Sequence, residues 1–133
     1  MADKDSSVIS RAAPVAAAGL EILTGAALFA APSFLARLLF GSEMGGSGDS
    51  VGRISGLVML CLAAGCLPTA SERGSPRALA PLLALSVLAA LYLLVVGAGG
   101  ANVGLLLWPA FATHAILAGL LARVWMASRR SGA

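Results

Sequence analysis

Charged residues are scarce in this sequence. Asp, Glu, Lys and Arg make up 11% of its 133 residues, whereas an ordinary soluble domain carries roughly 25%. A water-facing globule of this size would lack the charge to cover its surface, and a disordered chain needs more charge and less apolar sequence. Two cysteines are too few for a secreted fold held by disulfides. These shortages exclude all three classes of protein.

Side chains that bind metals or perform catalysis are equally few. The chain has one histidine, His114, and two cysteines, Cys61 and Cys66, which are too few for a mononuclear metal centre. It has no GxSxG motif, and the glycine-rich stretch Gly45–Gly48 lacks the Lys-Ser/Thr pair of a phosphate-binding loop. We therefore predict that the protein is not an enzyme and holds no metal or other cofactor.

Apolar residues fill most of the chain. They make up 59% of it, and the mean hydropathy is +0.92. A bilayer core about 30 Å thick is crossed by about 20 apolar residues in a helix. We expect four such spans, the first of them an uncleaved helix because it lacks the small −3 residue of a signal cleavage site. The spans are Ala12–Ala31, Ile54–Ala70, Ala78–Ala98 and Val103–Val124.

The connections between the spans complete the predicted architecture. Ser71–Arg77 and Gly99–Asn102 are tight turns. In the longer connection, Pro32 ends or kinks the first helix, Phe34–Phe40 is expected to form a short interfacial helix, and Gly45–Gly48 a flexible tip. Because backbone groups in hydrocarbon must be satisfied within their own segment, the sequence predicts an all-α, antiparallel four-helix transmembrane bundle. We expect residues 1–133 to form this single domain.

The basic residues predict an orientation. Cytoplasmic loops of membrane proteins are enriched in Lys and Arg, and one side of the predicted bundle holds seven of the nine basic residues. Both termini are therefore expected in the cytoplasm of a bacterium, with the chain spanning the inner membrane. The pI near 9.5 follows from this topology and from anionic lipids, and we expect no nucleic-acid partner. The seven residues are Lys4, Arg11, Arg73, Arg77, Arg123, Arg129 and Arg130.

Glu21 is the most informative residue. It follows Ala12 by nine residues, which places it about 14 Å into the membrane. A carboxylate there costs about 2.5–3.5 kcal/mol on insertion scales, so such a residue normally faces protein or water. Small neighbours on the same helical face predict that another helix packs closely against it. These neighbours are Ala17, Ala18, Thr24 and Gly25.

His114 is expected at the same depth. It follows Val103 by eleven residues, about 16 Å from the opposite side, and the first and fourth helices run antiparallel. We hypothesise that Glu21 and His114 meet inside the bundle as a hydrogen-bonded pair, which would serve as a proton relay. The alternative is that each bonds a neighbouring hydroxyl or carbonyl and only fixes helix packing.

The sequence also allows predictions for the charged residues of the longest connection, for the aromatic residues and for the cysteines. Arg37, Arg53, Glu43 and Asp49 flank the longest connection, where they form either a periplasmic cluster of charges that includes salt bridges or an anion site, with solvated side chains as the default. Trp108 and Trp125 are interfacial residues at opposite ends of the fourth span, and Tyr92 packs. Cys61 and Cys66 are small apolar packing residues. Close helix approach in the second span is expected at Cys61, Ala64 and Gly65.

Several short motifs resemble those of a known family. They are GAALFAAP at Gly25–Pro32, RISG at Arg53–Gly56, and LWPA at Leu107–Ala110 shortly before His114. With the four spans, they resemble small four-helix bacterial inner-membrane proteins of the DoxX-like type. The resemblance implies a four-helix bundle, and several members of that family are tied to quinone-linked or thiol-redox membrane systems. The redox cysteine pair or cofactor ligands of such systems are absent from this chain.

Three functions are compatible with these residues. The first is a non-enzymatic accessory subunit or modulator of a membrane complex, whose partners would be the lipid bilayer and a membrane protein or a second copy of the chain. The second is a proton-coupled small-molecule exporter that uses Glu21 as its proton carrier. The third, which we rank last, is a membrane redox enzyme that uses His114.

Overall fold

The computed structural model describes residues 2–66, 76–100 and 103–131, and side chains within 12–66, 79–100 and 103–130. In these ranges the chain forms five α-helices and no strand, so the predicted all-α class is confirmed. Four of the helices are long and apolar enough to cross a membrane, also as predicted. The helices are α1 (Ala2–Ala30), α2 (Pro32–Phe40), α3 (Ser47–Cys66), α4 (Pro76–Ala98) and α5 (Leu107–Ser131).

The break between α1 and α2 lies where the sequence predicts it. α1 ends at Ala30, and Pro32 stands at the first position of α2, where its missing N–H costs no helical hydrogen bond. The short helix expected from Phe34 to Phe40 is therefore confirmed, with two more residues at its start. Gly41 ends it with a positive φ of 70°, and the Gly41 N–H donates to the carbonyl of Arg37.

Two predicted boundaries are wrong. α3 begins at Ser47 rather than Ile54, so Ser47 and Gly48 belong to a helix and not to a flexible tip. Asp49 lies in the first turn, where a carboxylate is favoured by the helix dipole. α5 begins at Leu107 rather than Val103, because the segment 103–106 makes backbone hydrogen bonds to α2 instead.

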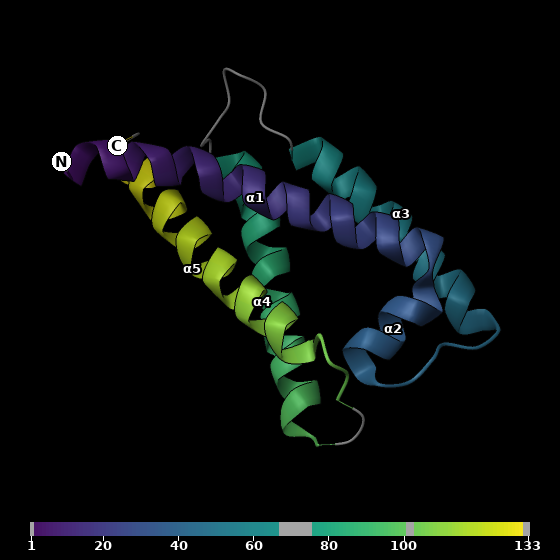
Figure 1. Cartoon of the computed structure of the whole chain (residues 1–133). Helices are drawn as coiled ribbons and strands as arrows, with labels where there is room; N and C mark the ends of the chain where they lie inside the picture. The colour runs from purple at the N-terminus through teal and green to yellow at the C-terminus, as the bar shows by residue number, and fades with distance from the viewer. Residues whose placement is uncertain (1, 67–75, 101–102, 132–133) are drawn as a thin grey trace.

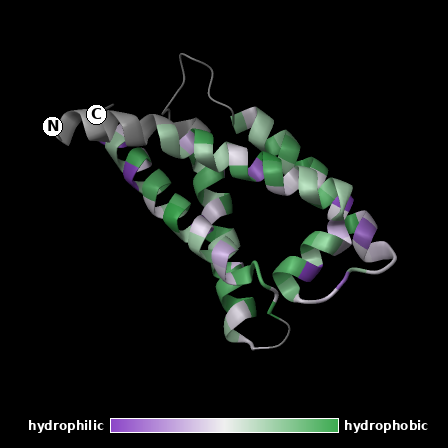
Figure 2. Cartoon of the chain, viewed as in Figure 1, coloured by the Kyte–Doolittle hydropathy of each residue, from purple (hydrophilic) through white to green (hydrophobic). Residues whose placement is uncertain are grey.

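The four long helices form two antiparallel pairs, α1 with α3 and α4 with α5. The pairs meet near the two chain termini and diverge away from them, and α2 lies between them at the wide end (Figure 1). We call these two ends the terminal end and the loop end. Figure 2 shows hydrophobic residues along the helices, with hydrophilic ones gathered around α2, at the start of α3 and near the end of α5.

An apolar core joins the two pairs near the terminal end. Leu79, Leu82 and Leu121 are almost completely buried in it. Cys66 belongs to this core and Cys61 is exposed, so the predicted apolar packing role is met by Cys66 alone. The remaining members are Ala13, Ala17, Leu117 and Val124.

Glycines bring α1 and α3 into backbone contact. A Cβ atom on Gly56 would lie 2.5 Å from the carbonyl oxygen of Gly25 on α1, and one on Gly52 would lie 2.6 Å from the side-chain Cβ of Pro32 at the start of α2. Gly52 and Gly56 form a GxxxG motif, which lets membrane helices approach closely. The expected approach at Cys61, Ala64 and Gly65 is wrong, since Gly65 has no neighbour within 4 Å of an added Cβ.

A second backbone contact holds α2 to the start of α5. The N–H groups of Gly104 and Leu106 donate to the carbonyls of Leu39 and Leu38, over 3.0 and 2.8 Å. These carbonyls belong to the last turn of α2 and have no partner within the helix. A Cβ atom on Gly104 would collide with the carbonyl oxygen of Leu38, so this site requires glycine. α2 therefore connects the two helix pairs at the loop end.

Replacing Gly56 with alanine should weaken the α1–α3 pair. The added methyl group would force the two backbones apart, and such overpacking costs about 1–3 kcal/mol. The free energy of unfolding, measured by SDS titration in mixed micelles with circular dichroism, should fall by that amount. Gly65→Ala is the matched control: it is open, and it should be neutral or up to about 1 kcal/mol more stable because alanine favours helix. Equal effects in both variants would contradict the glycine contact.

Candidate functional site

Glu21 lies inside the bundle, as the sequence predicts. Its side chain is 1% exposed, and its Oε2 atom is buried without a hydrogen-bond partner. Ala17, Ala18 and Gly25 on the same helix are also buried, and Thr24 is half-buried. The expectation that this face of α1 packs against other helices is confirmed.

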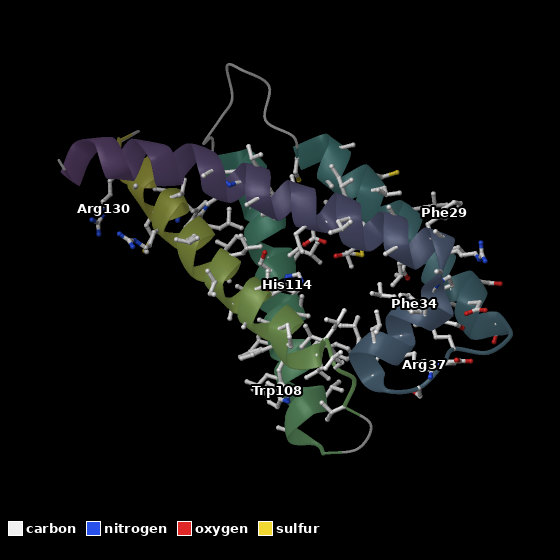
Figure 3. The ribbon with its side chains drawn as sticks, viewed as in Figure 1. Phe29, Phe34, Arg37, Trp108, His114 and Arg130 are labelled. Carbon is white, nitrogen blue, oxygen red and sulfur yellow. The ribbon has the colours of Figure 1, made fainter. Side chains whose placement is uncertain are left out.

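Two further polar side chains are buried without partners. His114 is 9% exposed and Ser86 is 1% exposed, and the His114 Nδ1 and Ser86 Oγ atoms have no hydrogen-bond partner. Figure 3 shows His114 on α5, nearer the start of the helix than its end. Ser86 was not among the residues selected from the sequence, although a lone hydroxyl in the strongly apolar run of α4 was a signal that could have found it.

These three residues form one layer next to the apolar core. Glu21 follows Ala17 by four residues on α1, and Ser86 follows Leu82 by four on α4. His114 precedes Leu117 by three on α5. Since residues three or four apart share a helical face, each polar residue continues a buried row by one turn toward the loop end. We call Glu21, Ser86 and His114 the polar layer.

The structure forms no hydrogen bond between Glu21 and His114. Glu21 Oε2 and His114 Nδ1 each lack a hydrogen-bond partner, and they belong to buried side chains on helices that contact each other, α1 and α5. Their shared depth follows from the buried rows, whereas the pairing itself and its use as a proton relay stay predictions. In the described ranges no three His, Cys, Asp or Glu side chains gather as metal ligands. The layer offers a carboxyl, a hydroxyl and an imidazole for hydrogen bonding.

A cavity of about 330 Å³ lies between the two helix pairs, on the loop side of the polar layer. We call it the inter-pair cavity. His114 and Thr24 are in its wall, whereas Glu21 and Ser86 are not. α2 closes it at the loop end through Leu35 and Leu39. The rest of the wall consists of Leu20, Leu23, Ala27, Leu93, Leu106, Pro109, Ala110 and Thr113.

A second hollow runs along the outside of the contact between α1 and α5. It has a volume of about 420 Å³, and we call it the α1–α5 groove. Gly19 lines it and has no atom within 4 Å of an added Cβ. The other lining residues are Ala16, Leu20, Leu23, Thr113, Ile116 and Leu117.

The four charged residues at the loop end do not form one cluster. Arg37 and Glu43 make a salt bridge of 3.3 Å, with side chains 68% and 65% exposed, and Figure 3 shows Arg37 on α2. Asp49 instead accepts a hydrogen bond of 2.5 Å from Ser33, whose hydroxyl also contacts the carbonyl of Met44. Arg53 is exposed on α3. An exposed pair such as Arg37–Glu43 contributes about 0–1 kcal/mol.

The aromatic residues lie mostly on the surface. Trp108 is half-exposed, stands edge-on to Phe111 at 6.0 Å and would contact a Cβ atom on Gly97. Trp125 lies under the guanidinium of Arg129, which is 4.4 Å from its ring. Their positions toward opposite ends of α5 leave the membrane-interface role a prediction. Tyr92 is exposed and packs edge-on against Phe40 at 6.4 Å.

No known protein family, curated protein or solved structure matches this chain. The resemblance to DoxX-like proteins therefore stays a prediction. The function has to be inferred from the polar layer, the inter-pair cavity and the α1–α5 groove.

Replacing Ser86 with alanine should leave stability unchanged or raise it by up to about 1 kcal/mol, because a buried hydroxyl without a partner is costly. The matched control is Ser33→Ala, which removes the contacts to Asp49 and Met44 and should cost about 1–3 kcal/mol. Both free energies of unfolding are measured by SDS titration. A loss above about 1 kcal/mol in Ser86→Ala would show that the hydroxyl has a partner.

Proposed function

We propose that this multi-pass membrane protein is a non-enzymatic accessory subunit or modulator of a membrane complex in the bacterial inner membrane. The α1–α5 groove is the observation on which this proposal depends. It lies on the membrane-embedded flank of the bundle, and small residues of α1 form part of its wall. Helices in membranes associate through close packing at small residues. The groove is thus suited to a transmembrane helix of a partner protein.

Gly19 supports a partner helix more specifically. Glycine in a helix costs about 1 kcal/mol relative to alanine, and within this chain Gly19 allows no close contact in return. Gly65 and Gly119 are equally open, but they are in the wall of neither the inter-pair cavity nor the α1–α5 groove. Gly19 is an open glycine in the wall of the groove. A partner helix in the groove would make close contact with the α1 backbone there.

The second candidate, a proton-coupled exporter, requires Glu21 to exchange protons with water or substrate. Glu21 is 1% exposed and is in the wall of neither hollow. A carboxyl group at this position can influence helix packing, but it contacts neither the inter-pair cavity nor the α1–α5 groove. The burial of Glu21 therefore favours the accessory role over export.

The distribution of charge supports cytoplasmic termini. Both termini lie at the same end of the structure (Figure 1). Arg123, Arg129 and Arg130 belong to the last turns of α5 near that end, and Lys4 and Arg11 belong to the start of α1. The loop end has Arg37 and Arg53, and two acidic residues accompany them. We propose that the terminal end faces the cytoplasm.

Reporter fusions should confirm this orientation. A green fluorescent protein joined after residue 133 should fluoresce, and alkaline phosphatase joined there should be inactive. Alkaline phosphatase inserted after Gly45, between α2 and α3, should be active because that connection faces the periplasm. The reverse pattern of activities would contradict the proposed topology.

Replacing Gly19 with leucine should release the partner. The larger side chain would fill the α1–α5 groove while facing away from the bundle core, so the fold should remain. In blue native electrophoresis after mild detergent extraction, the wild-type chain should migrate in a complex and the variant as a smaller species. The matched controls are Gly65→Leu and Gly119→Leu, both at open positions, and they should migrate like the wild type. A wild-type chain that migrates alone would overturn the accessory role.

A further inference from the structure

The inter-pair cavity has one polar group that its surroundings leave unused. The His114 side chain is in the wall and nine-tenths buried, and its Nδ1 atom has no hydrogen-bond partner. Nδ1 itself is enclosed by protein, so a molecule in the cavity cannot reach it. Nε2 is not enclosed and makes no hydrogen bond within the described residues, so it is the nitrogen to which a molecule in the cavity would bond.

The rest of the wall defines what such a molecule must be. Apart from His114, it consists of aliphatic side chains and the two hydroxyls of Thr24 and Thr113. Thr113 uses its hydroxyl to donate to the carbonyl of Pro109 over 2.8 Å, which leaves its oxygen free to accept. The wall contains neither a carboxylate nor a Lys or Arg cation. A charged ligand would therefore lose its hydration without gaining a counter-ion.

The hydrogen-bonding groups favour a hydroxyl over a carbonyl. A neutral imidazole has one donor and one acceptor nitrogen, whichever of the two is protonated. A hydroxyl group can donate to the acceptor nitrogen or accept from the donor, and it can also donate to the free oxygen of Thr113. A carbonyl can only accept, so it would satisfy just one tautomer of His114.

The size and place of the cavity fix the remaining properties. A volume of about 330 Å³ is about ten times the ~30 Å³ share of one water molecule in the liquid. An apolar space of this kind tends to stay dry and to bind apolar molecules. The cavity lies between helices that span the bilayer, so its occupant arrives from the lipid.

We infer that the inter-pair cavity binds an uncharged, membrane-soluble molecule with a compact apolar skeleton and one hydroxyl group, which bonds to His114. The class includes phenols and small terpenoid or aliphatic alcohols. α2 separates the bound molecule from the loop end through Leu35 and Leu39. This binding does not depend on the proposed accessory role, but the cavity adjoins the α1–α5 groove, and the two share Leu20, Leu23 and Thr113.

The probe for this proposal is 1-naphthol, and naphthalene is its matched analogue without the hydroxyl. Binding to the purified protein in detergent micelles is measured by saturation-transfer NMR and by the rise in the thermal unfolding midpoint. Protein-free micelles correct for partition of the probes. Wild-type protein should bind 1-naphthol roughly two- to twelvefold more tightly than naphthalene, the range for one net hydrogen bond. In His114→Leu this preference should vanish while naphthalene still binds.

Variants that fill the cavity test its location. Ala27→Phe from α1 and Ala110→Phe from α5 each place a ring in the cavity, and each should weaken 1-naphthol binding about tenfold or more, a change of about 1.4 kcal/mol or more. Ala26→Phe, one residue from Ala27 but on the exposed face of α1, should bind like the wild type. Unchanged affinity in both folded cavity variants would overturn the proposal, as would equal wild-type affinity for 1-naphthol and naphthalene.

A measurement on the wild-type chain covers the case in which the cavity variants do not fold. Octanol bearing a photoreactive diazirine is irradiated with the protein, and the labelled residues are identified by mass spectrometry. Adducts should form on the cavity wall, at residues such as Leu93 and Leu39, and excess 1-naphthol should suppress them. Labelling confined to the lipid-facing surface, without protection by 1-naphthol, would overturn the proposal.

Discussion

This chain is held together by close contacts between backbones. They occur at positions where a side chain would not fit. In hydrocarbon the hydrophobic effect does not drive helices together, so close packing and satisfied backbone groups must do so. Gly25 and Gly56 allow this between α1 and α3, and Gly104 allows it between α2 and the start of α5. The first contact forms a helix pair, and the second connects α2 to the other pair. Toward the loop end the two pairs diverge, with α2 between them (Figure 1).

That divergence creates the features that a function can use. Near the termini the pairs close on a core of alanine, leucine and valine. One turn farther on, the same three helical rows contribute Glu21, Ser86 and His114, each with one buried side-chain atom that has no hydrogen-bond partner. Beyond them the pairs are far enough apart to leave a cavity that α2 closes. The polar layer therefore separates a filled region of the bundle from an open one.

The same sequence pattern predicted some parts of the site and missed others. Glu21 and His114 were found because ionisable groups in apolar runs are costly and must face inward. Ser86 was overlooked because a single hydroxyl costs far less and gives a weak signal. The four charged residues at the loop end were predicted as one group. In the structure Asp49 accepts a hydrogen bond from Ser33, and of the four residues only Arg37 and Glu43 form a salt bridge. The Ser33 hydroxyl reaches Asp49 because of the way α2 folds back toward the start of α3. Hydropathy carries no information about that path.

The sequence by itself determined the number of helices long and apolar enough to cross a membrane, the break at Pro32 and the burial of Glu21. Each follows from local composition, from backbone chemistry or from the cost of burying a charge. The tertiary structure decided where the helices touch. On α3 the close contacts are made at Gly52 and Gly56, and not at Cys61, Ala64 and Gly65. Residues 103–106 make hydrogen bonds to α2 instead of extending α5. Several small-residue faces compete for contact in such a chain, and only the three-dimensional path of the connections selects among them.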